Sequence, residues 1–93
     1  MAPDPASRLR AAAAVGRTAE LEVLLAQGAP IDAPDADGNT ALMKSIQADR
    51  PEAVALLRRH GASLELKNRA GLSARDMAKA KGDTALDDAL GLD

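Results

Sequence analysis

The sequence contains no cysteine, tryptophan, tyrosine or phenylalanine, and only one histidine. Without cysteine, the chain cannot form disulfides, thiolate metal sites or a cysteine nucleophile. Without aromatic residues, its core must be built from alanine and aliphatic side chains. Side chains this small need close packing of the backbone elements, which an Ala-rich helical array supplies more readily than a sheet does. The composition therefore predicts an all-α protein.

Long hydrophobic runs and a strong charge of one sign are also absent. No apolar run approaches the ~18 residues of a membrane-spanning helix, and residues 1–6 lack the hydrophobic segment of a secretory signal. We therefore expect a cytoplasmic protein without a membrane partner, or an exported one if a signal peptide has been removed. The formal net charge is −2. With no aromatic side chains to stack on bases, we expect no nucleic-acid partner.

The charges that are present are unevenly distributed. Residues 58–81 contain seven Lys and Arg but only two acidic residues, and four Asp follow. A basic band beside an acidic tail favours an acidic partner, although mixed charges also occur on ordinary solvated surfaces.

The most informative feature that is present is an internal repeat of 33 residues. Residues 28–29 recur at 61–62, and residues 38–42 recur at 71–75. A fixed period of this length is typical of stacked repeat proteins, which offer a surface to a partner and build a continuous core from residues in register. The residues in register are Leu24, Leu57 and Leu90, Leu21 and Val54, Leu9 and Leu42, and the small residues Ala12, Ser45 and Ala78.

Capping residues, glycines and prolines predict six helices in three antiparallel pairs. The segments before residues 40 and 73 are rich in Pro, Gly and Asp, and predict extended loops that double back. The expected helices are 7–15 with Ser7 as N-cap, 18–27, 41–48 with Thr40 as N-cap, 51–59 starting at Pro51, 74–81, and 84–90 with Asp83 as N-cap.

Two helices, a glycine stop and a projecting hairpin in each period resemble the ankyrin repeat family. The resemblance is carried by residues 16–29, 35–43 and 52–62, and it covers nearly all of residues 7–90. It implies an α solenoid of two to three repeats, whose helix pairs are joined by β-hairpin-type loops. The expected organisation is a flexible tail over 1–6 and one domain over 7–93, with repeats at about 7–34, 35–67 and 68–91.

Three positions depart from the family pattern. Met43 stands where the family has a histidine, and cannot make the hydrogen bonds that a histidine makes between repeats. Asp49 replaces a glycine, so it must adopt a left-handed conformation or shift the turn. Arg75 stands where the preceding repeat has Leu42, which suggests a solvent-facing end.

No motif favours catalysis or metal binding. His60 directly precedes a helix-stopping glycine, where exposure or C-terminal capping is the usual role, and no base–nucleophile pair is evident. The alternating carboxylates of residues 32–39 look like a calcium loop. However, Met43 or Ile46, depending on the starting aspartate, occupies the position where such a loop needs its bidentate Glu. We expect no enzyme activity, no cofactor and no metal.

The resemblance implies a monomeric, non-catalytic module that binds another protein through its hairpin tips and the exposed faces of its first helices. It would serve as an inhibitor, an antidote or an accessory protein. The alternative is a structural fragment of a longer array with its main binding surface elsewhere. Leu72 is the expected anchor unless it packs against the neighbouring hairpin. Carried over to this sequence, the expected contact residues are Asp37, Asn39, Lys44, Gln47, Arg69, Leu72 and Lys81.

Overall fold

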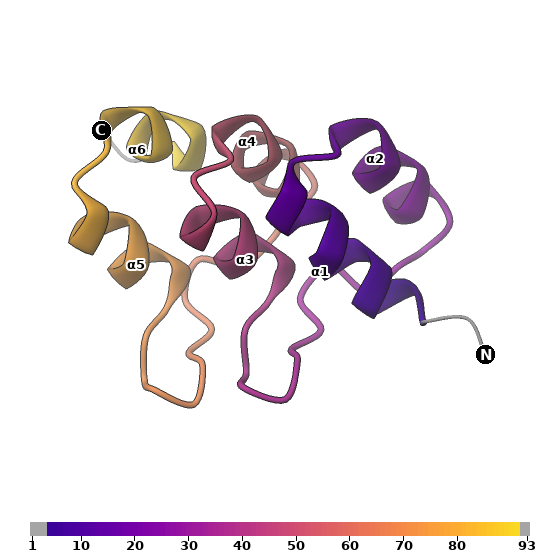
Figure 1. The fold of residues 1–93 in the computed structure, drawn as a ribbon, viewed down its shortest axis with the longest axis horizontal. Helices are drawn as coiled ribbons and strands as arrows, with labels where there is room; N and C mark the ends of the chain where they lie inside the picture. Colours follow the sequence, from indigo (N-terminus) through magenta and orange to yellow (C-terminus); the bar gives the residue numbers. More distant parts are fainter. Residues whose placement is uncertain (1–3, 92–93) are drawn as a thin grey trace.

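A computed structural model describes residues 4–91 of the chain. Within them lie the helices α1 (Pro5–Val15), α2 (Thr18–Ala26), α3 (Ala41–Gln47), α4 (Pro51–Arg59), α5 (Ala74–Lys81) and α6 (Thr84–Leu90). Figure 1 shows α1, α3 and α5 side by side in one layer and α2, α4 and α6 in a second layer, with two loops projecting from the same edge. The predicted all-α stack of antiparallel helix pairs is confirmed.

The capping residues set most of the helix boundaries as predicted. The Thr40 hydroxyl accepts a hydrogen bond from the Met43 amide at the start of α3 (3.3 Å). Ser73 and Asp76 form a reciprocal capping box at the start of α5, in which each side chain accepts a hydrogen bond from the other residue's amide. At the other end of a helix, Gly16 stops α1 in a left-handed conformation (φ 74°).

The predicted start of the first helix is wrong. Asp4, and not Ser7, is the N-cap of α1, because the Asp4 carboxylate accepts a hydrogen bond from the Ser7 amide (2.7 Å). Pro5 then occupies the first helical position, where its missing N–H costs nothing. Pro5 and Ala6 therefore belong to the helix, whereas residues 1–3 of the predicted tail lie outside the described residues.

Two of the departures from the family pattern have local solutions. Asp49 adopts the left-handed conformation (φ 57°), and is the one described residue other than glycine that does so. Met43 is fully buried, and its Sδ accepts a hydrogen bond from the Thr40 amide (3.4 Å). The thioether thus completes the cap of α3 within its own repeat, and this hydrogen bond is not one of those that a histidine makes between repeats.

The core follows the 33-residue register. The rows of large apolar residues and the row of small residues named above are all buried, and α3 contacts both α1 and α5. In the last repeat of one row, the partly exposed Arg75 forms an ion pair with Glu65 (2.8 Å), whereas its equivalent, Leu42, is fully buried. No helix in the described part of the chain is long and apolar enough to cross a membrane.

Candidate functional site

Each projecting loop is held by one side chain at its base. In hairpin A (residues 35–39), the Asp35 Oδ1 atom accepts hydrogen bonds from the amides of Asp37 and Asn39, both at 2.9 Å. In hairpin B (residues 68–72), the Asn68 Oδ1 atom accepts from the amides two and four residues later, at 2.9 and 3.0 Å. Asp and Asn are favoured at such positions because their side chains imitate a backbone turn. The two tips therefore have the same fixed shape.

The carboxylate of Asp35 stays charged although it is partly buried. Desolvation raises its pKa, but hydrogen bonds from the amides of Asn39 and Asp37 and an interaction with Lys44 outweigh this effect, so the pKa lies below its ordinary 3.8. The Lys44 Nζ atom is 3.3 Å from Asp35 Oδ2. Both oxygens of the Asp35 carboxylate, one of those that resembled a calcium loop, thus have donors within the protein.

The hairpins are bonded to each other. The Arg69 amide donates to the Asp37 carbonyl (2.9 Å), and the Asn68 Nδ2 atom donates to Asn39 Oδ1 (2.9 Å). Gly38 lies against this contact: a Cβ atom added to it would be 2.9 Å from the Asn68 Cα atom. The absence of a side chain at Gly38 therefore lets hairpin B stack on hairpin A.

A hollow of about 370 Å³ lies between hairpin B and the first helices α3 and α5. We call it the groove. Leu72 projects from the hairpin and is 44% exposed, while Met77 of α5 is nearly buried. The Gln47 amide nitrogen contacts both Asn39 Oδ1 (3.4 Å) and Met77 Sδ (3.7 Å). The residues that line the groove are Gln47, Asn68, Leu72, Asp76, Met77, Ala80 and Lys81.

Charged groups stand at the rim of the groove. Lys81 forms an ion pair with Asp49 (3.3 Å between Nζ and Oδ1). Hydrogen bonds from the backbone and hydroxyl of Ser73 hold the pKa of Asp76 below its ordinary 3.8 against the effect of desolvation, and Lys67 and Lys79 lower it further. The groove is thus an apolar centre between fixed charges of both signs.

The predicted contact residues fall into three groups. Gln47, Leu72 and Lys81 line the groove. Asp37 and Arg69 are exposed at the hairpin tips. The remaining two, Asn39 and Lys44, are partly buried and bonded within the protein.

Of the other four groove residues, Ala80 is 33 residues after the predicted Gln47, and three were not predicted: Asn68, Asp76 and Met77. The register contained a signal for two of them. Met77 is 33 residues after the predicted Lys44, and Asn68 is 33 residues after the turn-forming Asp35. Asp76 carried no such signal, because its equivalent is the buried Met43.

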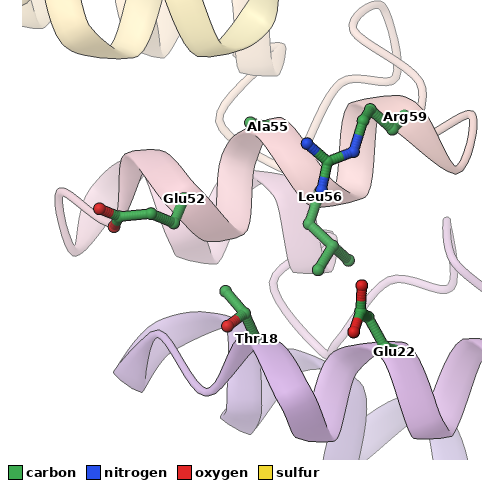
Figure 2. A pocket seen from close by; sticks show the side chains of 6 residues that line it. All are labelled: Thr18, Glu22, Glu52, Ala55, Leu56 and Arg59. Atoms are coloured by element: carbon green, nitrogen blue, oxygen red, sulfur yellow. The ribbon is translucent and has the colours of Figure 1, made fainter.

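A second hollow, of about 290 Å³, lies between α2 and α4 on the other layer. Figure 2 shows Leu56 of α4 pointing toward α2 between Thr18 and Glu22, with Glu52 and Arg59 on either side of it. The hollow is lined by two carboxylates, one guanidinium and a leucine, so its charges do not favour either a cationic or an anionic ligand clearly. This hollow contains none of the predicted contact residues.

The single histidine, His60, lies at the C-terminal end of α4. His60 is the exposed C-cap of α4, and its backbone amide donates to carbonyls of the last helical turn. Among residues 4–91, no three His, Asp or Glu side chains come close enough together to hold a metal ion.

A stack of antiparallel helix pairs with a row of bonded hairpins defines a repeat scaffold. The chain matches the family model described as "Ankyrin repeats (many copies)" over residues 9–58, just over half of its length. It belongs to the ankyrin repeat family, whose members are generally protein–protein interaction modules and typically non-catalytic. No curated protein matches the chain.

Proposed function

We propose that the protein is a monomeric, non-catalytic binding module that contacts a partner protein with the groove and the two hairpin tips. The observation that carries this proposal is the position of Leu72. A leucine that is 44% exposed lines a hollow together with the apolar side chains of Met77 and Ala80. Apolar side chains in a concave site with a polar rim are typical of residues that anchor an interface.

The size of the groove limits the contact. A hollow of about 370 Å³ has room for one or two large side chains of a partner. Complete burial of a leucine side chain stabilises by about 1.5–3 kcal/mol, so covering the exposed part of Leu72 contributes about 1 kcal/mol. Without Trp or Tyr on this surface, most of the remaining affinity must come from polar contacts.

Charge supports a partner with acidic side chains at this surface. Lys44 and Lys81 are already paired with Asp35 and Asp49. Other cations near the groove form no ion pair within residues 4–91: Lys67, Arg69 and Lys79. These groups would steer an acidic partner and make association sensitive to salt.

The test compares two leucines with the same exposure. Leu66 is also 44% exposed, but it does not line the groove. A partner captured from native cell extract with the wild-type protein is expected to lose roughly tenfold or more in affinity for Leu72→Asp, and to bind Leu66→Asp normally. Equal binding of both variants, or equal losses, would remove the groove from the proposal. Circular dichroism would check that both variants remain folded.

A second candidate function is that of a section within a longer stack. Val23 is 55% exposed on α2, whereas its equivalent, Leu56, is buried between α4 and α2. That exposure favours a covering element beside α2. The opposite end is different, because Arg75 and Lys79 stand where the preceding repeat buries Leu42 and Ile46. Val23→Lys would separate the candidates: a covering element would be lost from the complex, whereas binding at the groove would persist.

A further inference from the structure

Hairpin B has an outer face equivalent to the face of hairpin A that hairpin B itself covers. On hairpin A, the covered groups are the Asp37 carbonyl, which accepts from the Arg69 amide (2.9 Å), and Gly38, which lies against the Asn68 backbone. A tight turn packed on a glycine, with one backbone hydrogen bond, is therefore an arrangement this protein already uses.

Thirty-three residues later, the same groups are uncovered. The equivalent acceptor is the Ala70 carbonyl, to which no group among residues 4–91 donates. The equivalent glycine is Gly71, which has the same φ of 80° as Gly38. A Cβ atom on Gly71 would meet no atom within 4 Å, and Ala70 and Gly71 are both exposed. The outer face of hairpin B thus has the shape and the acceptor to receive another turn.

One position on this face differs in chemistry. Asn39 on hairpin A accepts a hydrogen bond from the Asn68 side chain (2.9 Å). Its equivalent on hairpin B is Leu72, whose side chain has no acceptor and which is 44% exposed. An amide placed against Leu72 would lose its partner, whereas an apolar side chain would be buried. A segment that covers hairpin B must therefore be apolar where Asn68 is polar.

We propose that the outer face of hairpin B docks a tight turn of a partner protein. A backbone N–H of that turn donates to the Ala70 carbonyl, its main chain passes over Gly71, and an apolar side chain packs on Leu72. The proposal rests on the protein-binding function above and adds a contact that adjoins the groove at Leu72.

The neighbouring surface favours a separate turn over another whole repeat or a second copy of this chain. A stacked repeat would bury Arg75 and Lys79, which occupy the positions of the buried Leu42 and Ile46. In a second copy stacked end to end on α5 and α6, the helix pair α1 and α2 would come first. That copy would then bury the same two charged residues, Arg75 and Lys79.

The test uses two cyclic peptides as probes, followed by amide chemical shifts of the isotope-labelled protein. One peptide has the sequence of residues 66–73, and the other carries Asn68→Leu, with the ring closure holding the turn in place of the two hydrogen bonds that Asn68 Oδ1 accepts. Each is titrated into the wild-type protein and into Leu72→Asn. A pair is matched when peptide position 68 and protein position 72 are both Leu or both Asn. Matched pairs are expected to bind about threefold to tenfold tighter than mismatched pairs, because a mismatch leaves a buried amide without a hydrogen-bond partner. The shifts should centre on residues 69–72.

Gly71→Ala is the blocking variant and Gly61→Ala is its matched control. Both glycines have a positive φ and open space around a Cβ atom, but only Gly71 lies on the proposed face. Peptide binding should be lost in Gly71→Ala and kept in Gly61→Ala. Shifts that persist in Gly71→Ala, or no shifts at residues 69–72 with either peptide on either protein, would overturn the proposal.

Two further outcomes keep the alternatives distinct. If the amides of residues 69–72 shift on raising protein concentration without peptide, the face belongs to a second copy and the assignment to a partner turn is wrong. If Leu72→Asp abolishes partner capture while neither peptide docks, the proposed groove function stands and the turn-docking proposal fails.

Discussion

Gly38 and Gly71 offer a direct measurement of how strongly the two hairpins stabilise each other. The sequence makes them equivalent, and both have φ 80°. Their surroundings differ: a Cβ atom on Gly38 would lie 2.9 Å from Asn68 Cα and 3.0 Å from the Arg69 nitrogen, whereas one on Gly71 would meet nothing within 4 Å. Alanine at each position imposes the same backbone strain, and only Gly38→Ala adds a clash with backbone atoms.

The expected magnitudes follow from these contacts. Alanine in a left-handed conformation costs about 1–2 kcal/mol, partly offset by about 0.4–1 kcal/mol because the unfolded chain is more restricted. Gly71→Ala should therefore lower the free energy of unfolding by about 1 kcal/mol. Gly38→Ala adds about 1–3 kcal/mol for overpacking and about 1 kcal/mol for the hydrogen bond between Arg69 and Asp37. The expected difference is about 2–4 kcal/mol, or roughly 8–30 °C in Tm.

Urea and thermal unfolding followed by far-UV circular dichroism would measure both variants. Intrinsic fluorescence is not an option, since the chain has no Trp, Tyr or Phe. Equal losses of stability in the two variants would refute the reasoning, because they would mean that hairpin B does not pack on hairpin A in solution. A larger loss for Gly71→Ala would contradict the open surroundings of that residue.

Substitutions at three further positions test the packing and the turns. Ser45→Ala should cost about 1 kcal/mol or less, since only its hydrogen bond to the Leu42 carbonyl is lost, while Ser45→Leu should cost about 1–3 kcal/mol by overpacking; equal costs would contradict a close approach of helices there. Met43→Leu should cost less than about 1.5 kcal/mol and Met43→Ala about 2–5 kcal/mol, measured by urea unfolding; a larger loss for Met43→Leu would mean that the sulfur contact dominates. Asp35→Asn should keep both turn hydrogen bonds, as Asn68 does, and be more stable than Asp35→Ala by about 1–2 kcal/mol.

The Asp35 variants also predict a pH dependence. Because the folded-state pKa lies below 3.8, the stability contributed by this ionised carboxylate is present above pH 3.8 and is lost as pH falls through the folded-state pKa. Asp35→Asn removes this contribution, so its unfolding free energy should fall less steeply than that of the wild type over the same window. Parallel curves would show that the amides and Lys44 do not favour the charged carboxylate.

The helices could be predicted because their ends are coded locally. Thr40, Pro51 and Ser73 act within one turn of the chain, and glycines in left-handed conformations stop the helices that precede them. The error at α1 has the same local origin: Ser7 and Asp4 are both good caps, and the following Pro5 decides in favour of Asp4. The periodicity of the sequence does not show which of two capping residues less than one helical turn apart begins the helix.

The binding surface was harder to predict because exposure does not determine whether a polar side chain is free to bind. Lys44 and Asn39 have the polarity and position expected of contact residues. The structure uses them for a link to Asp35 and for the contact between hairpins. Met77 was missed for the opposite reason: methionine in a helix reads as core, and only the geometry of hairpin B leaves it at the edge of a hollow. These outcomes depend on contacts between a hairpin and the first helix of its own repeat, or between the two hairpins.

The position of a repeat in the stack explains why equivalent residues in different repeats can have different roles. A residue in an inner repeat is packed by the repeat that follows it, so Leu42 and Gly38 are buried or tightly packed. Arg75 and Gly71 occupy the same register positions without a following repeat among the described residues. The sequence adapts to this at Arg75 by a change to a charged residue, but it keeps a glycine at position 71, where the left-handed turn still needs one. The turn chemistry thus keeps on hairpin B the backbone shape that hairpin B covers on hairpin A, and the change from Asn39 to Leu72 alters what the proposed docking face would accept.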